Sequence, residues 1–133
     1  MLRKVLVIDD EYVIRQTIRK QLDGTAFEVI EAEDGEQGIE VLNTLDNPLT
    51  VEVIICDIRM PKINGIEAIA YFRNEYPSTP LIVLTGYPDV TLATDLLKQG
   101  VYDYLTKPVD KQSLVGAVMK ASQQRTLFTS QSN

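Results

Sequence analysis

Two kinds of hydrophobic pattern alternate along the chain. Five short runs are rich in β-branched and aromatic residues, as buried β-strands are. These runs are KVLVID at residues 4–9, FEVIEA at 27–32, VEVIICD at 51–57, LIVLT at 81–85 and YDYLT at 102–106. Because VLVI, VIIC and LIVL are the most uniformly apolar, we expect them to form the centre of a sheet.

The segments between and after these runs have the spacing of amphipathic helices. The expected inward faces contain Ile14, Ile18 and Leu22; Ile66, Ile69, Phe72 and Arg73; Val90, Ala93 and Leu97; and Leu114, Ala117, Val118 and Ala121. Asp110 is placed to cap the last of these helices. Residues 34–43 form the remaining helical segment, although Gly35 and Gly38 lower its helix propensity.

Five strands that alternate with five helices predict an α/β fold, in which helices cover both faces of a doubly wound parallel sheet. The proline-containing stretches DNPL, EYPSTP and TGYPD are predicted to be loops. We expect residues 1–123 to form a single domain. Residues 124–133 lose the helical periodicity and turn polar, which indicates a frayed end or the start of a linker.

Composition narrows the function classes. The chain has 133 residues, enough to bury one substantial core, and its 13 basic and 19 acidic residues give a net charge of −6. That balance argues against direct nucleic-acid binding, which needs clustered Lys and Arg. No run approaches the roughly 20 apolar residues of a membrane helix, and the start lacks the long apolar region of a secretory signal. A single cysteine, Cys56, suits a reducing compartment, so the cytoplasm is the expected location.

Chemically active side chains follow several of the predicted strands. Asp9, Asp10 and Glu11 follow the first strand, Asp57 ends the third, Thr85 ends the fourth, and Lys107 comes directly after the fifth. In parallel sheets of this class the site lies outside the carboxyl ends of the strands, so these groups should converge. The chain has no histidine, so an oxygen-rich cluster of this kind favours a hard cation, most plausibly Mg²⁺. An aspartate beside such a cation can act as a nucleophile toward a phosphoryl group.

Four motifs together carry a family resemblance. The stretches VLVIDDE, DIRMPKING, LTG and YLTKP match, in order and spacing, the signatures of response-regulator receiver domains of two-component signalling. Each motif is weak alone, but together they are specific, and the similarity spans residues 4–121. The resemblance implies a flavodoxin-like fold with five parallel strands in the order 2-1-3-4-5.

The resemblance also implies residue roles. Asp57 would be the phosphoacceptor, and Asp9 and Asp10 would form the acidic pocket, where Asp10, Asp57 and the backbone carbonyl of Arg59 hold Mg²⁺. Further positions of the motifs correspond to the family's switch hydroxyl at Thr85, its phosphate-binding lysine at Lys107, its aromatic switch residue at Tyr104 and its cis X-Pro bond at Lys107–Pro108.

Simpler structural roles remain possible for several of these residues. Considered without the other site residues, Asp57 could be a turn residue, and Asp9 and Asp10 could cap the first helix. Glu11 is expected to be a solvated residue of the first helical turn rather than a metal ligand. Tyr104 could simply be a core aromatic.

One hypothesis concerns the rim of the expected site. Arg59 and Tyr87 lie two residues beyond Asp57 and Thr85, where they could overhang the phosphoryl group and control the access of hydrolytic water.

We therefore predict a phosphorylatable switch rather than a turnover enzyme, one that assists its own phosphorylation and dephosphorylation. A histidine kinase or phosphotransfer protein would donate the phosphoryl group. The surface of the fourth helix, fifth strand and fifth helix would then change its affinity for a downstream protein, an effector domain or a second copy of the chain. The alternatives are a degenerate receiver that binds partners without phosphorylation and an aspartate-nucleophile phosphatase. The phosphatase is disfavoured because no cap-sized insertion is present.

Overall fold

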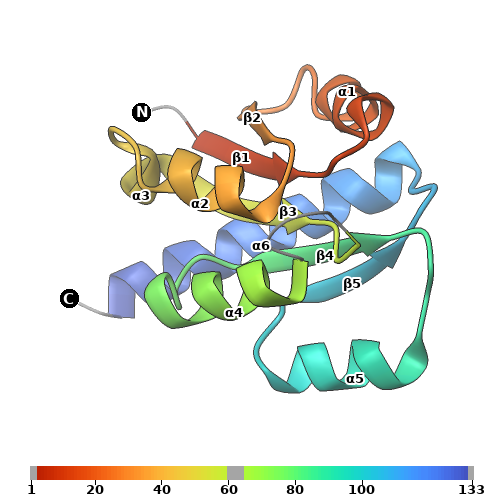
Figure 1. The fold of residues 1–133 in the computed structure, drawn as a ribbon. Helices are drawn as coiled ribbons and strands as arrows, with labels where there is room; N and C mark the ends of the chain where they lie inside the picture. The colour runs from red at the N-terminus through yellow and green to blue at the C-terminus, as the bar shows by residue number, and fades with distance from the viewer. Residues whose placement is uncertain (1–2, 60–64, 132–133) are drawn as a thin grey trace.

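The sheet has the predicted composition and order. The computed structural model describes residues 3–59 and 65–131. Within them, five parallel strands pair in the order β2-β1-β3-β4-β5. The strands are β1 (Arg3–Ile8), β2 (Phe27–Ala32), β3 (Val51–Cys56), β4 (Leu81–Thr85) and β5 (Asp103–Thr106). β1, β3 and β4 are the central strands, as their apolar sequences predict, and the arrows of β1, β4 and β5 point to the right in Figure 1.

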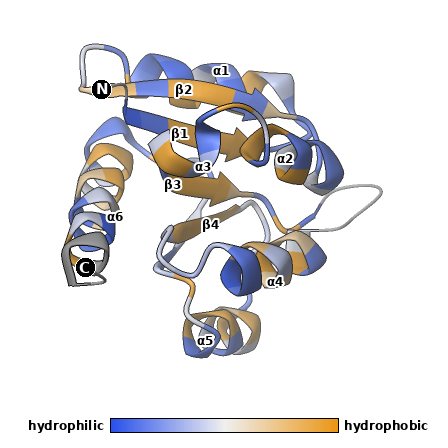
Figure 2. Cartoon of the chain, turned by 90° about the vertical axis from the view of Figure 1, so that its left-hand side faces the viewer, coloured by the Kyte–Doolittle hydropathy of each residue, from blue (hydrophilic) through white to orange (hydrophobic). Residues whose placement is uncertain are grey.

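Helices cover both faces of this sheet. They are α1 (Tyr12–Gln21), α2 (Gly35–Leu42), α3 (Asn47–Thr50), α4 (Gly65–Glu75), α5 (Val90–Lys98) and α6 (Lys111–Gln131). One buried cluster joins the strands to α1 and α6, and a second joins them to α2, α4 and α5. Figure 2 shows hydrophobic residues along β1, β3 and β4 and on the helix faces that meet them. The doubly wound α/β fold is therefore confirmed.

The helix α3 corrects the predicted number of five helices. The DNPL stretch, which was predicted to be a loop, contains one helical turn with Pro48 near its start. A proline is compatible with the first helical turn, where its missing N–H would have no intrahelical partner. Asn47 and Thr50 are buried here, and the Asn47 side chain donates to the carbonyl of Val41 at 2.7 Å.

The inward face of α5 also differs from the prediction. Val90 is 84% exposed and Leu97 is 47% exposed, whereas Leu96 is buried and Leu92 packs against the core. Both sets of apolar residues have helical spacing, so periodicity alone could not choose between them. The contacts with the sheet select Leu92 and Leu96 and leave an apolar strip on the outer surface.

Helix α6 extends beyond the predicted boundary at residue 123. Asp110 caps its start by accepting a hydrogen bond from the Ser113 amide at 3.1 Å, as expected. Beyond the apolar stretch, polar contacts continue: Ser122 is bonded to the Arg3 side chain at 2.8 Å, and Arg125 donates to the Leu49 carbonyl at 3.0 Å. Polar contacts leave no pattern of apolar residues in the sequence, so hydrophobic periodicity predicted an end near residue 123. The role of residues 124–133 as a linker stays a prediction.

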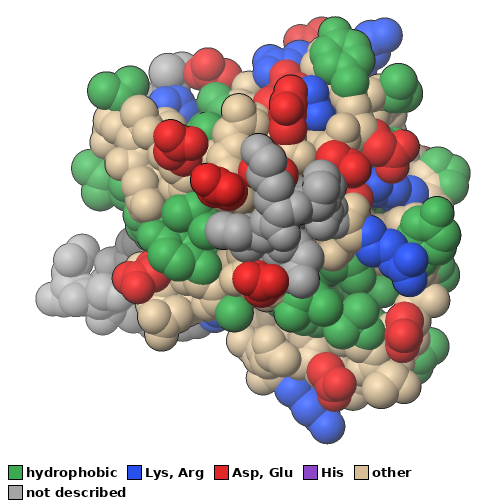
Figure 3. All heavy atoms as spheres, viewed as in Figure 1, with side chains coloured by type: hydrophobic (Ala, Val, Ile, Leu, Met, Phe, Trp, Pro, Cys, Tyr) green, Lys and Arg blue, Asp and Glu red, His purple; other side chains and the backbone are tan. Residues whose placement is uncertain are grey.

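Three smaller points complete the fold. Met60 and Pro61, which belong to the loop motif DIRMPKING, lie outside the described residues. Acidic side chains are spread over the face of the molecule shown in Figure 3, in keeping with the negative net charge. Within residues 3–59 and 65–131, no helix combines the length and the apolar character needed to cross a membrane.

Candidate functional site at the carboxyl ends of the strands

The pairing of β1 with β3 brings the predicted carboxylates together. Ile8 and Cys56 are register partners, and the amide of Asp57 donates to the carbonyl of Ile8 at 2.9 Å. Asp9 and Asp57 thus lie side by side just beyond the strands, where they are 2% and 4% exposed. Each of four residues, Asp9, Asp10, Glu11 and Asp57, contributes one carboxylate oxygen to a group whose atoms lie within 4.8 Å of one another.

Lys107 places its ammonium in the middle of this acidic cluster. Its Nζ lies 2.8 Å from Asp9 Oδ2, 3.1 Å from Asp57 Oδ2 and 3.4 Å from Glu11 Oε1. Burial alone would lower the pKa of Lys107, but the hydrogen bonds and negative charges of Asp9 and Asp57 outweigh it and raise that pKa. Lys107 is therefore a permanent cation at neutral pH.

Backbone amides fix the two buried carboxylates. Asp9 Oδ1 accepts a hydrogen bond from the Glu11 amide at 2.9 Å, and Asp57 Oδ1 accepts one from the Arg59 amide at 3.0 Å. Burial raises the pKa of Asp9, although its contacts with Lys107 and the Glu11 amide oppose that shift. The burial of Asp9 and the nearby charge of Asp57 thus act against its contact with Lys107.

The donor set fits a hard divalent cation. All four side chains of the acidic cluster offer carboxylate oxygens, which are the ligands that Mg²⁺ prefers. One ammonium cannot neutralise four carboxylates, so a further positive charge would be favoured among them. The neighbouring thiol of Cys56 adds no soft ligand, because burial raises its pKa and keeps it protonated. The residues present thus suit Mg²⁺ better than zinc or another thiophilic metal.

An open pocket of about 350 Å³ adjoins the acidic cluster. It is lined by Asp10, Glu11, Asp57, Arg59, Gly86, Tyr87 and Lys107. The Arg59 guanidinium carbon lies 4.2 Å from the centre of the Tyr87 ring, a cation–π contact between the loops that follow β3 and β4. The two predicted tuning residues therefore meet at the rim of the pocket that contains Asp57.

Thr85 ends β4 and Tyr104 lies in β5, next to strand ends whose following residues Gly86, Tyr87 and Lys107 line the pocket. Thr85 is fully buried, and its hydroxyl accepts a hydrogen bond from the Tyr87 amide at 3.1 Å. The amide of Lys107 donates to the Thr85 carbonyl at 2.7 Å, which joins the ends of the two strands. The Tyr104 hydroxyl accepts from the Asp89 amide at 3.3 Å, at the start of α5. The Lys107–Pro108 peptide bond is cis, as the resemblance implied.

The structure decides against one of the simpler roles. The N-cap residue of α1 is Glu11, whose side chain makes no capping hydrogen bond, and Asp9 Oδ1 accepts from the Glu11 amide rather than from an amide inside the helix. The side chain of Glu11 is 60% exposed, as expected of a solvated residue, and its carboxylate also contacts Lys107 and belongs to the acidic cluster. Its place directly after the Asp9-Asp10 pair was the available signal in the sequence.

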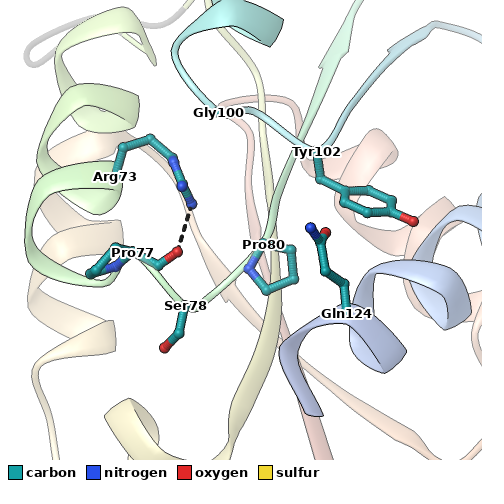
Figure 4. A pocket seen from close by; sticks show the side chains of 7 residues that line it. All are labelled: Arg73, Pro77, Ser78, Pro80, Gly100, Tyr102 and Gln124. Atoms are coloured by element: carbon teal, nitrogen blue, oxygen red, sulfur yellow. Dashed lines mark hydrogen bonds between the residues drawn. The ribbon is translucent and has the colours of Figure 1, made fainter. Parts of the chain in front are cut away.

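A second cavity, of about 210 Å³, lies beside Pro80 and Tyr102, which directly precede β4 and β5 (Figure 4). Its lining contains one cation, Arg73, and no carboxylate. The Arg73 guanidinium donates to the Pro77 carbonyl at 3.2 Å and packs against Gly100. This cavity is separate from the acidic cluster and shares no lining residue with the pocket beside Asp57.

Comparison with known proteins agrees with the geometry. The sequence model described as response regulator receiver domain matches residues 5–119. The C4-dicarboxylate transport transcriptional regulatory protein DctD of Pseudomonas aeruginosa is 35% identical over 93% of this chain and 26% of its own length. The transcriptional regulatory protein DegU of Brevibacillus brevis is 35% identical over 90% of this chain and 50% of its own length. The chain thus spans half or less of these relatives.

A solved structure shows the same fold. The response regulator receiver domain protein from Clostridium thermocellum superposes with a TM-score of 0.87 at 34% identity, covering 96% of this chain and 99% of that one. The family match over most of the chain, the shared fold and the acidic cluster at the strand ends agree: the chain belongs to the response regulator receiver domain family.

Proposed function

We propose that Asp57 accepts a phosphoryl group and that this chain is a phosphorylation switch. The observation that carries the proposal is the position of the Asp57 carboxylate, which is held by the Arg59 amide, contacts the Lys107 ammonium and opens onto a pocket. In the reaction, an oxygen of Asp57 attacks phosphorus and the bond between phosphorus and the donor breaks. The donor, a phosphohistidine of a kinase or of a phosphotransfer protein, leaves with the bonding electron pair.

The residues around Asp57 have distinct parts in this transfer. Lys107 would turn its ammonium from Asp57 to an oxygen of the incoming phosphoryl group, and it neutralises charge there. Asp9, Asp10, Asp57 and the carbonyl of Arg59 would hold Mg²⁺, which supplies positive charge to the phosphoryl oxygens when it is bound. The same groups orient water for hydrolysis, so the chain assists both steps without turning over an external substrate.

The test is the intact mass after incubation with acetyl phosphate, with and without Mg²⁺. We expect wild type to gain one phosphoryl group only with Mg²⁺, and Asp57→Asn to gain none. Asp23→Asn, an exposed carboxylate beyond the end of α1, is the matched control and should behave as wild type. No gain in wild type would favour a degenerate, phosphorylation-independent binding module. Continuous release of phosphate from many monoesters would favour a phosphatase.

The signal would pass from β4 and β5 to the surface of α5, β5 and α6, which are the fourth helix, fifth strand and fifth helix of the sequence prediction. In our proposal, the Thr85 hydroxyl leaves the Tyr87 amide for the phosphoryl group, and Tyr104 shifts with it, which breaks its contact with the Asp89 amide. The exposed Val90 and Leu97 on α5 give this surface apolar groups for a downstream protein, an effector domain or a second copy of the chain. Phosphorylation would have to favour one state by about 5.5 kcal/mol to move the equilibrium from 1:99 to 99:1.

Arg59 and Tyr87 are proposed to set the lifetime of the phosphorylated state. Their stacked side chains line the pocket where hydrolytic water must approach. We expect Arg59→Ala and Tyr87→Ala each to change the dephosphorylation rate, and the double variant to change it by less than the sum of the two effects, since both remove one contact. A double variant that loses phosphate at the wild-type rate would refute this role.

A further inference from the structure

Arg15 is a buried charge directly behind the acidic cluster. It lies in the first turns of α1 and is only 7% exposed. Its Nη1 donates to the backbone carbonyl of Asp9 at 2.8 Å, and its Nε donates to Glu31 Oε1 at 2.9 Å. A buried guanidinium is costly unless its charge and its donors are matched; here Glu31 supplies the opposite charge, two N–H donors are bonded, and the centre of the Tyr12 ring lies 5.6 Å from Cζ.

Glu31 holds this guanidinium in one orientation. It extends from β2 and accepts hydrogen bonds from three side chains of α1: Arg15, Gln16 at 3.1 Å and Arg19 at 3.0 Å. Burial would raise the pKa of Glu31, but the hydrogen bonds from Arg19, Arg15 and Gln16 lower it overall. Glu31 thus stays ionised, and its bond to Nε keeps the Arg15 guanidinium turned so that Nη1 faces the Asp9 carbonyl.

The backbone of Asp9 is held at both its amide and its carbonyl. Its amide donates to the Ala32 carbonyl at 3.1 Å, and its carbonyl accepts from Arg15. These two contacts and the bond from the Glu11 amide to the Asp9 side chain hold the turn at residues 9–11. Three of the four carboxylates of the acidic cluster belong to this turn.

We propose that Arg15 is a positioning residue for the cation site: it fixes the Asp9–Asp10 peptide and thereby the directions of the Asp9 and Asp10 carboxylates. The inference rests on the proposed Mg²⁺ role of this cluster. Removing a residue that orients the ligands of a metal, without touching the metal, commonly lowers metal affinity by about 10- to 100-fold.

The experiment compares three variants with wild type. Arg15→Met removes both contacts, and Arg15→Lys keeps the charge but not the planar fork that bridges Asp9 and Glu31. Arg19→Met is the matched control, because Arg19 also donates to Glu31 but has no bond to Asp9. For each protein we would measure the Mg²⁺ dissociation constant by isothermal titration calorimetry, the stability to urea without Mg²⁺, and the Mg²⁺ concentration that gives half-maximal phosphorylation by acetyl phosphate.

We expect Arg15→Met to weaken Mg²⁺ binding by about tenfold or more, with a matching rise in the half-maximal Mg²⁺ concentration and recovery at saturating Mg²⁺. Arg15→Lys should lose less affinity, and Arg19→Met should keep the wild-type affinity while losing some stability. Unchanged affinity in both Arg15 variants would overturn the inference, as would an equal loss in Arg19→Met.

If Arg15→Met does not fold, Arg15→Lys decides by the same criterion. Failure of the proposed function looks different: wild type itself would bind no Mg²⁺ and gain no phosphoryl group.

Discussion

Gly65 offers a test of how closely α4 must approach the strand that carries Asp57. A Cβ added at this position would lie 2.2 Å from the Asp57 carbonyl oxygen and 2.3 Å from the Cα of Ile58. Both atoms belong to the backbone, so no side-chain rotation can relieve the contact. The helix or the strand end would have to move by roughly 1 Å to restore an ordinary separation.

The magnitude for Gly65→Ala follows from two opposing terms. Forcing extra atoms into a packed site costs about 1–3 kcal/mol, and a backbone obstacle places this case near the upper end. Alanine in place of glycine gains up to about 1 kcal/mol in a helix interior, and at most that at Gly65, the first residue of α4. We expect a net loss of about 2 kcal/mol in the free energy of unfolding, a large share of the 5–15 kcal/mol typical of domains.

Gly116→Ala is the matched control for this variant. Gly116 lies in α6, and an added Cβ there would meet nothing within 4 Å. Only the helix-propensity term applies, so this variant should gain up to about 1 kcal/mol. Urea unfolding followed by far-UV circular dichroism gives both values from the midpoint and slope. A Gly65→Ala variant as stable as wild type would refute the reasoning, because it would show that α4 does not need to lie this close to Asp57.

Three further predictions concern groups that are partly or fully buried. Glu31→Gln should cost about 1 kcal/mol at pH 7, because it weakens charged hydrogen bonds at a partly exposed site. The folded-state pKa of Glu31 is lowered, so the stability difference between this variant and wild type should be complete above the ordinary carboxyl pKa. It should vanish as pH falls through the folded-state pKa. Ser122→Ala should cost about 1–2 kcal/mol in urea unfolding, because the fully buried hydroxyl joins Arg3 to Glu52. The Cys56 thiol should react with Ellman's reagent only in urea, because it is fully buried and burial raises its pKa.

Each of these has a contrary result. A Glu31→Gln effect that stays constant between pH 7 and pH 3 would mean that ionisation of Glu31 contributes nothing. Wild-type stability in Ser122→Ala would mean that the network around Arg3 does not anchor α6. Rapid labelling of Cys56 without denaturant would mean that the third strand opens readily in the folded state.

Much of the fold could be predicted because buried parallel strands have a distinctive composition. Runs such as VLVI and LIVL are typical of strands whose side chains are buried on both faces of a parallel sheet. The carboxylates that follow such strands are then expected at the carboxyl ends of the sheet. Periodicity failed where two faces of a helix were equally apolar, as in α5, where the sheet selected Leu96 and left Val90 outside. It also missed α3 and the extension of α6, which depend on a proline in the first turn and on polar contacts.

The residues of the candidate site likewise fall into those that the sequence indicated and those that it did not. The sequence determined the residue types and their order, since Asp9, Asp10, Asp57 and Lys107 follow strands whose ends must meet. It did not indicate Arg15, although this residue lies on the same helical face as Ile18 and Leu22, at positions i, i+3 and i+7. A charge on a buried stripe is a signal, but its partner could not be named from the chain alone.

Only the tertiary structure brought Glu31 of β2 against α1 and set the Arg15 guanidinium on the Asp9 carbonyl. Hydrophobic burial is non-directional and follows composition, so it can be predicted from a linear pattern. A hydrogen bond between groups from different elements depends on distances of about 3 Å and on angle, and these exist only after the elements have packed.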